Sequence, residues 1–215
     1  MKQHEFSFEL KPVAPFRLDF TVWALRRRSD NAIDRWDGET YRRVLPIGEH
    51  AAEVAVRQMR SPERPKLEVR VSGAKTNDST KSAVAAAVER LLGLRVDLAE
   101  FYRFAGSNAR LERLAGRFRG MKPPRFPTVF EALVNAIACQ QVTLTLGIQL
   151  LNKVAAHYSL LAGGGSTFAF PRPQDLADRR PDDFRRLGFS RQKGRAIIEL
   201  AQSITSGRIR PGSLG

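Results

Sequence analysis

The first third of the chain places apolar residues at alternate positions, as β-strands do. Three runs, at residues 6–10, 52–56 and 67–71, put their apolar side chains on one face, which is typical of half-buried strands. A fourth strand-like segment spans residues 41–47 and follows the turn signal Asp37-Gly38. We therefore predict an antiparallel sheet.

Two segments beside these strands have helical spacing instead. The face expected to be buried in the first helix consists of Phe16, Phe20, Trp23 and Ala24. The face expected in the second consists of Val84, Val88, Leu91 and Leu92, with Gly93 near its end. Both helices are predicted to pack on the sheet.

From Leu98 onward the chain shows only helical spacing. The first apolar positions of this part are Leu98, Phe101, Tyr102, Leu111, Leu114 and Phe118. The whole pattern predicts an α+β domain over residues 1–95, an antiparallel sheet with packed helices, and an all-α domain over residues 96–215.

Residues 126–158 hold two amphipathic helical patterns joined by a polar corner, Cys139-Gln140-Gln141-Val142-Thr143. The face predicted to be buried in the first helix consists of Phe130, Leu133, Val134 and Ile137. That of the second consists of Leu144, Ile148, Leu151 and Val154. We expect Thr128 and Glu131 to form a capping box at the first helix, and Thr143 to cap the second.

The two glutamines of this corner are candidates for contact with a nucleic acid. A glutamine side chain donates and accepts hydrogen bonds at once, so Gln140 and Gln141 suit a base edge or the gap left by an extruded nucleotide. On chemistry alone, a solvated turn is the alternative, because glutamine is common on surfaces.

The charge of the chain favours a polyanionic partner. Lys and Arg number 36 against 22 Asp and Glu, which gives a net charge of +14 and a pI near 10.9. Duplex DNA fits such a surface, since cations that neutralise phosphates release counterions. An anionic membrane is the competing partner. However, the sequence has no stretch of 18 apolar residues and no signal-peptide core, so we expect a soluble cytoplasmic protein that binds no membrane.

Cysteine and histidine usage argues against a metal site. Cys139 is the single cysteine, and His4, His50 and His157 are scattered. We therefore expect no internal disulfide, no metal site and no iron–sulfur cluster.

Two cations lie at the start of a predicted helix near the C-terminus. Ser190 is the expected N-cap, and Arg191 and Lys193 occupy the first turn. Because cations there oppose the helix dipole, their presence favours a bound anion such as a DNA phosphate. A solvated basic turn is an equally weighted alternative. Arg26, Arg27 and Arg28 need no ligand, because they follow a helix whose dipole they complement.

Three segments resemble a known protein family. They are KPPRFPTVFEALVNAIACQQVT at residues 122–143, FPRPQDL at residues 170–176 and LGFSRQKGRA at residues 187–196. These resemble the catalytic domain of type II 3-methyladenine DNA glycosylases, which belong to the helix-hairpin-helix glycosylase superfamily. The resemblance implies a monomeric enzyme that flips an alkylated purine out of duplex DNA and hydrolyses its N-glycosidic bond without a cofactor.

The resemblance also implies roles for individual residues. The residue at position 141 would plug the space left by the flipped nucleotide, where type II enzymes often use leucine, and Gln140 matches the preceding glutamine of the family. Further expected DNA-binding residues are Arg125, Thr143, Ser190, Arg191 and Lys193. Trp23 would line the base pocket, because an N-terminal aromatic does so in related enzymes, although a core position is the stronger expectation for it.

The family's defining hairpin and its catalytic Asp would follow residue 214, so we expect no catalytic residue within residues 1–215. A catalytically inactive DNA-binding fragment is therefore one alternative function. A glycosylase for another damaged base, such as an oxidised purine, is a second.

Overall fold

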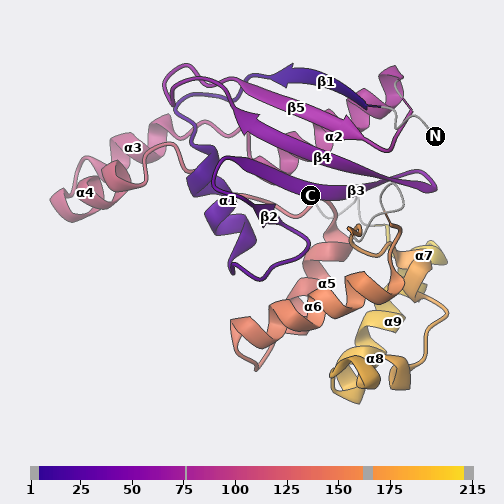
Figure 1. The fold of residues 1–215 in the computed structure, drawn as a ribbon. Coiled ribbons are helices and arrows are strands. Elements are labelled where there is room, and N and C mark those ends of the chain that lie inside the picture. The colour runs from indigo at the N-terminus through magenta and orange to yellow at the C-terminus, as the bar shows by residue number, and fades with distance from the viewer. Residues whose placement is uncertain (1–4, 76, 162–166, 211–215) are drawn as a thin grey trace.

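The computed structural model describes residues 5–75, 77–161 and 167–210. Figure 1 shows a sheet in the N-terminal part and a group of helices below it. The strands are β1 (Glu5–Leu10), β2 (Arg35–Trp36), β3 (Thr40–Ile47), β4 (His50–Gln58) and β5 (Leu67–Ser72). The first four helices are α1 (Leu18–Arg26), α2 (Asp78–Leu92), α3 (Ala99–Ala105) and α4 (Ala109–Arg117). Those of the second half are α5 (Val129–Cys139), α6 (Leu144–Tyr158), α7 (Pro173–Leu176), α8 (Pro181–Leu187) and α9 (Arg191–Thr205).

The five strands form one antiparallel sheet in the order β1-β5-β4-β3-β2. Its register pairs Val69 with Phe8 on one side and with Val56 on the other. All four predicted strand segments lie in this sheet, so the predicted α+β part followed by an all-helical part is confirmed. The sequence pattern missed β2, because two residues are too few to show alternation. The division at residue 95 stays a prediction.

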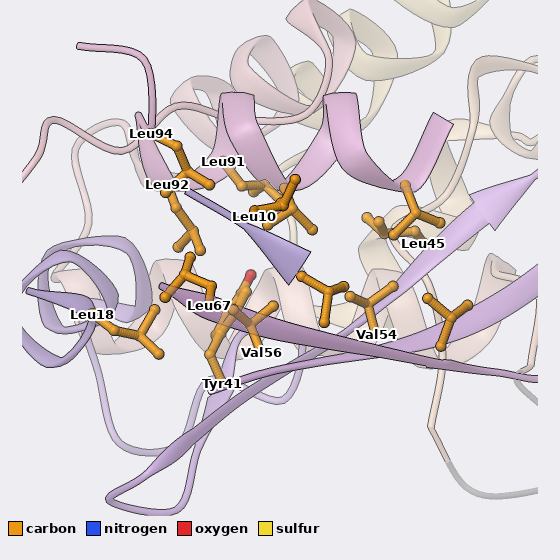
Figure 2. Close-up of a cluster of buried hydrophobic side chains, with 14 of the residues drawn as sticks. Leu10, Leu18, Tyr41, Leu45, Val54, Val56, Leu67, Leu91, Leu92 and Leu94 are labelled. Atoms are coloured by element: carbon orange, nitrogen blue, oxygen red, sulfur yellow. The ribbon is translucent and has the colours of Figure 1, made fainter. Parts of the chain in front are cut away.

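The core of the N-terminal part lies between the sheet and α2. Figure 2 shows Leu91 and Leu92 facing Leu67, Val54 and Val56 of the strands. The face predicted for α2 is confirmed, since all four of its residues are buried. Gly93 ends α2 in the left-handed region, at φ 60°. A side chain at this position would also meet the carbonyl oxygen of Pro123, because an added Cβ would lie 2.7 Å from it.

The face predicted for α1 is wrong. The helix buries Leu18, Thr21, Val22 and Leu25. Phe16 is buried but precedes the helix, and Trp23 is 66% exposed. The segment carries two overlapping apolar stripes at helical spacing, and the aliphatic one faces the sheet. Trp23 instead stacks on Phe118, with the ring centroids 6.3 Å apart and the ring planes inclined by 11°.

Helices α3 and α4 confirm the helical spacing found after Leu98, and they extend sideways from the rest of the molecule (Figure 1). Their apolar side chains are largely exposed: Phe101, Phe104, Leu111 and Leu114. Across the described part of the chain, no helix is both long enough and apolar enough to cross a bilayer.

Helix α5 packs an apolar stripe on α6 and α9 and also buries polar residues. The predicted position of Leu133 in the core is wrong, since this side chain is 38% exposed, whereas Glu131 and Asn135 are buried. Thr128 caps the helix as predicted, accepting a hydrogen bond from the Glu131 amide at 3.1 Å. The second bond of the expected capping box, in which the Thr128 amide would donate to the Glu131 carboxylate, is absent among the described contacts. That carboxylate instead accepts hydrogen bonds from Arg43 of β3.

Candidate nucleic-acid interface

The polar corner between α5 and α6 places two glutamines at its apex. Gln140 and Gln141 are exposed, and within the described chain their side chains form no hydrogen bond. Gln141 has φ 51°, in the left-handed region that residues other than glycine rarely adopt. Such a conformation costs about 1–3 kcal/mol and persists only where the surrounding structure enforces it. The backbone of the apex is therefore restrained by its surroundings, while the side chains of Gln140 and Gln141 remain exposed.

Two contacts hold the corner from the side of α6. Thr143 is the N-cap of α6 as predicted, and its hydroxyl accepts a hydrogen bond from the Leu146 amide at 3.3 Å. One turn further on, Gly147 passes close to Cys139, so that an added Cβ would lie 2.6 Å from the Cys139 sulfur. Only glycine fits here without movement, and this close approach keeps the corner short.

A third contact comes from α9. Ser190 caps this helix as predicted, accepting a hydrogen bond from the Lys193 amide at 3.2 Å. The Lys193 ammonium donates to the carbonyl oxygen of Ala138 at 3.1 Å and to that of Gln140 at 2.7 Å. No local sequence pattern predicts these two bonds, because they join residues more than fifty positions apart. They place the start of α9 directly against the glutamine corner.

Arg191 lies in the same turn of α9 but faces a different environment. With Arg179, Arg180 and Arg195, it lines an open cleft of about 800 Å³. Arg195 pairs with Glu199 at 2.7 Å and Arg179 lies over the Tyr158 ring at 4.9 Å. Arg191 is exposed and has no hydrogen bond or ion pair to any described residue. The cleft therefore carries an excess of positive charge.

Arg125 lies away from this group. It is exposed and precedes α5, whereas the glutamines follow that helix. Eleven helical residues span about 16 Å, so Arg125 lies at the opposite end of α5. It borders a separate cleft of about 290 Å³ with Arg90 and Arg95. The structure thus brings together all the predicted DNA-binding residues except Arg125.

Trp23 lines another small cleft. This cleft of about 310 Å³ also contains Trp36 and the three arginines Arg26, Arg27 and Arg28. The Arg27 guanidinium donates a 2.7 Å hydrogen bond to the side-chain oxygen of Asn135 on α5. The expectation of a core position for Trp23 is therefore wrong, because its side chain is exposed and borders this cleft.

A buried ionic cluster anchors α5 to the sheet. Arg43 donates one hydrogen bond of 2.7 Å to Asp34 and two of 2.6 Å to Glu131. Burial lowers the pKa of Arg43, but the charges of Asp34 and Glu131 outweigh it and raise that pKa well above its usual range. Tyr41 donates a 2.7 Å bond to Asp34, and burial together with that carboxylate raises its pKa well above its usual range.

Three of the acidic residues near α9 are engaged by neighbouring groups. Asp175 accepts hydrogen bonds from the backbone and side chain of Arg172 at 2.7 to 3.1 Å. Asp183 caps α8 through the Arg180 amide at 2.8 Å, and Asp182 lies 3.6 Å from Arg185. Among the described residues, no group of three or more His, Cys, Asp or Glu side chains is arranged to hold a metal ion.

The sequence matches two protein-domain families. The model of the AlkA N-terminal domain matches residues 7–127, more than half of the chain. The chain belongs to the AlkA N-terminal domain family. The model described as HhH-GPD superfamily base excision DNA repair protein matches residues 134–214. These two domain matches confirm the resemblance of this AlkA-type chain to the type II 3-methyladenine glycosylase family.

Individual relatives agree with this assignment. The AlkA-type chain is 27% identical over 115 residues to DNA-3-methyladenine glycosylase of Bacillus subtilis (strain 168), and 31% identical over 103 residues to DNA-3-methyladenine glycosylase 2 of Escherichia coli (strain K12). These matches cover 53% and 47% of this chain. They span 38% and 36% of the two relatives, little more than a third of their length.

Solved structures show the same fold at lower identity. The 3-methyladenine DNA-glycosylase from Archaeoglobus fulgidus superposes with a TM-score of 0.77 at 21% identity, over 90% of this chain and 66% of that one. The 8-oxoguanine glycosylase/lyase of Clostridium acetobutylicum superposes with a TM-score of 0.66 at 16% identity, over 98% of this chain and 68% of that one. The AlkA-type chain shares its fold with glycosylases named for two kinds of base damage.

Proposed function

We propose that this chain engages duplex DNA as part of a base excision repair glycosylase, and that Gln141 fills the gap left by an extruded nucleotide. The observation that carries this proposal is the apex itself, where Gln141 is exposed and left-handed and the corner is held by contacts from α6 and α9. A pre-formed apex loses little conformational entropy on insertion. The net charge of +14 supplies the attraction to phosphates.

Around this apex, the proposed contacts divide by chemistry. Gln140 and Thr143 flank Gln141 and would meet the bases or sugars next to the gap. Ser190 and Arg191 at the start of α9 would lie along the phosphates, with the arginine-lined cleft continuing that track, and Lys193 would support the corner beside them. Arg125 would touch the backbone at a separate point, one helix length away.

The proposed reaction is hydrolysis of the N-glycosidic bond of an alkylated purine such as 3-methyladenine, without a cofactor. Its support is the family assignment and the names of the bacterial relatives. The positive charge of an alkylated base already weakens its bond to the sugar. The remaining tasks are to flip the nucleotide, to hold the base against an aromatic ring such as Trp23, and to stabilise the positively charged sugar with a carboxylate.

An oxidised purine is the second candidate substrate. Three consecutive arginines border the Trp23 cleft, and their positive potential disfavours a cationic base. An oxidised purine is neutral and carries an additional carbonyl oxygen that accepts hydrogen bonds. To separate the two candidate substrates, binding of the unaltered chain and of Arg28→Ala is measured on a duplex with a methylated purine and on one with an oxidised purine. Improved retention of only the methylated duplex by Arg28→Ala would favour the oxidised purine as the natural ligand.

A DNA substrate also implies where the protein works. We propose that it acts as a monomer in the cytoplasm of a bacterial-type cell, associated with the nucleoid through DNA.

The decisive experiment compares binding to an abasic duplex and to the intact duplex of the same sequence. Gln141→Ala is expected to weaken abasic binding roughly tenfold, the equivalent of one or two hydrogen bonds, while intact-duplex binding stays unchanged. Gln149→Ala is the matched control, because Gln149 is exposed on α6 away from the corner. Equal losses on both duplexes, or no preference in the unaltered chain, would refute the role of Gln141.

A further inference from the structure

Lys193 differs from the other cations around the corner because its charge is already used inside the protein. Its ammonium lies 2.7 Å from the Gln140 carbonyl oxygen and 3.1 Å from that of Ala138. Both carbonyls lie at the C-terminal end of α5, where helix carbonyls lose their intrahelical partners and the dipole is negative. The ammonium therefore satisfies the end of α5 in both charge and hydrogen bonding.

From this geometry we propose that Lys193 is a positioning residue, which holds the backbone of Gln140 so that Gln141 keeps its left-handed conformation. The proposal rests on the proposed role of Gln141 and assigns Lys193 to the corner rather than to phosphate binding. Lys193 acts on Gln141 through a single peptide group, because the Gln140 carbonyl that it binds belongs to the peptide bond just before the φ angle of Gln141.

The remaining contacts among the described residues give the Gln140 carbonyl no other hydrogen-bond donor. The bond from the Gln140 amide to the Ile137 carbonyl is long, at 3.4 Å. Thr143 restrains the chain only after Gln141. Gly147 packs against Cys139, before Gln141, but this contact forms no hydrogen bond to the Gln140 carbonyl. Among the described side chains, Lys193 alone donates to the carbonyls of Ala138 and Gln140. Without the bond from Lys193, no hydrogen bond to the Gln140 carbonyl would oppose the relaxation of Gln141 from φ 51°.

The packing of α9 keeps Lys193 in reach. Gly194, the next residue, lies against Phe184 of α8, so that an added Cβ would come within 2.8 Å of the Phe184 Cβ. This close approach fixes the first turn of α9. Arg191, two residues earlier, points elsewhere, since positions i and i+2 of a helix do not share a face. One turn therefore supplies a structural cation at 193 and a free cation at 191.

The test compares Lys193→Met with Arg191→Met as the matched control, because methionine removes the charge from either position and keeps an unbranched chain. Dissociation constants are measured for abasic and intact duplexes over a series of salt concentrations. For Lys193→Met we expect a roughly tenfold loss of the abasic preference, with the salt dependence unchanged. For Arg191→Met we expect equal losses on both duplexes and a salt slope smaller by about 1.

A double-mutant cycle shows whether Lys193 acts through Gln141. Adding Lys193→Met to Gln141→Ala is expected to cause no further loss of abasic preference, because residues that act through one another are not additive. Hydrogen exchange of the amides in residues 139–143 of the free protein is expected to accelerate in Lys193→Met and not in Arg191→Met. Additive losses in the cycle would overturn the proposal.

The outcomes separate this proposal from the proposed function. If the unaltered chain shows no abasic preference, both fail. If Gln141→Ala abolishes the preference and Lys193→Met keeps it, only the role of Lys193 fails. Equal losses on both duplexes with a smaller salt slope would make Lys193 a phosphate ligand instead. Should Lys193→Met not fold, Lys193→Arg carries the test: retained preference supports positioning by a cation, and lost preference in a folded protein overturns it.

Discussion

The Arg43 guanidinium on β3 donates two hydrogen bonds of 2.6 Å to the Glu131 carboxylate on α5. Both side chains are at least 95% buried, and they join the sheet to the helix that ends at the glutamine corner. The orientation of α5, and with it the direction in which Gln141 points, therefore depends on a charge pair removed from water.

Replacing Arg43 with methionine is expected to lower the free energy of unfolding by about 3–5 kcal/mol, because it leaves Asp34 and Glu131 as buried carboxylates without a cation. Urea unfolding followed by circular dichroism measures this. Arg195→Met is the control, since the pair of Arg195 and Glu199 is solvent-exposed and should contribute little to stability.

A second outcome distinguishes the buried charge from simple loss of packing. The triple variant Arg43→Met, Asp34→Asn and Glu131→Gln removes all three charges and should recover part of the loss. A triple variant no more stable than Arg43→Met alone would show that uncompensated charge is not the cause.

Gly147→Ala should destabilise the protein by about 1–3 kcal/mol through overpacking, because the new methyl group would lie 2.6 Å from the Cys139 sulfur. Cys139→Ala in the same chain should relieve much of this, since it removes that sulfur. Thermal unfolding of the single and double variants gives both values. Gly116→Ala is the control: it lies in α4 with no atom near an added Cβ, and alanine there should stabilise the helix by up to about 1 kcal/mol.

Trp23→Ala should change stability far less than a core truncation, because the ring is 66% exposed and mainly contacts Phe118. We expect a loss of about 1 kcal/mol, against 2–5 kcal/mol for Leu25→Ala on the buried face of the same helix. Denaturant midpoints of the two variants decide this. A larger loss for Trp23→Ala than for Leu25→Ala would restore the core position expected from the sequence.

The contrast between these two residues shows how far the sequence predicts the fold. Alternation at period two identified four strands, because each has one face against a common core. In α1 the same reasoning failed, since two apolar stripes of similar strength overlap and only the shape of the packed sheet selects Leu25 over Trp23. Periodicity gives the kind of element more reliably than the direction it faces.

The candidate site was predictable to a similar degree. Gln140, Gln141 and the caps Thr143 and Ser190 follow from local patterns, and the structure places them together. The bonds of Lys193 to the corner and of Glu131 to Arg43 are tertiary, and no local pattern encodes them. Glu131 was expected to cap its own helix because the capping-box spacing is present, but the buried guanidinium of Arg43 is the stronger partner.

The described acidic residues are not expected to cleave an N-glycosidic bond. Incubation of the 215-residue chain with methylated duplex DNA is expected to release no 3-methyladenine above a control without protein. Stabilising the sugar cation needs a carboxylate positioned to face it, and three candidates near α9, Asp175, Asp182 and Asp183, are each held by an arginine or a helix cap. Chromatography of the freed bases measures release, and binding to an abasic duplex confirms that the same sample is folded. Release above the control would contradict this. Asp182→Asn would then be tested first, because its 3.6 Å pairing with Arg185 is the weakest of the three and leaves its carboxylate most available to a substrate.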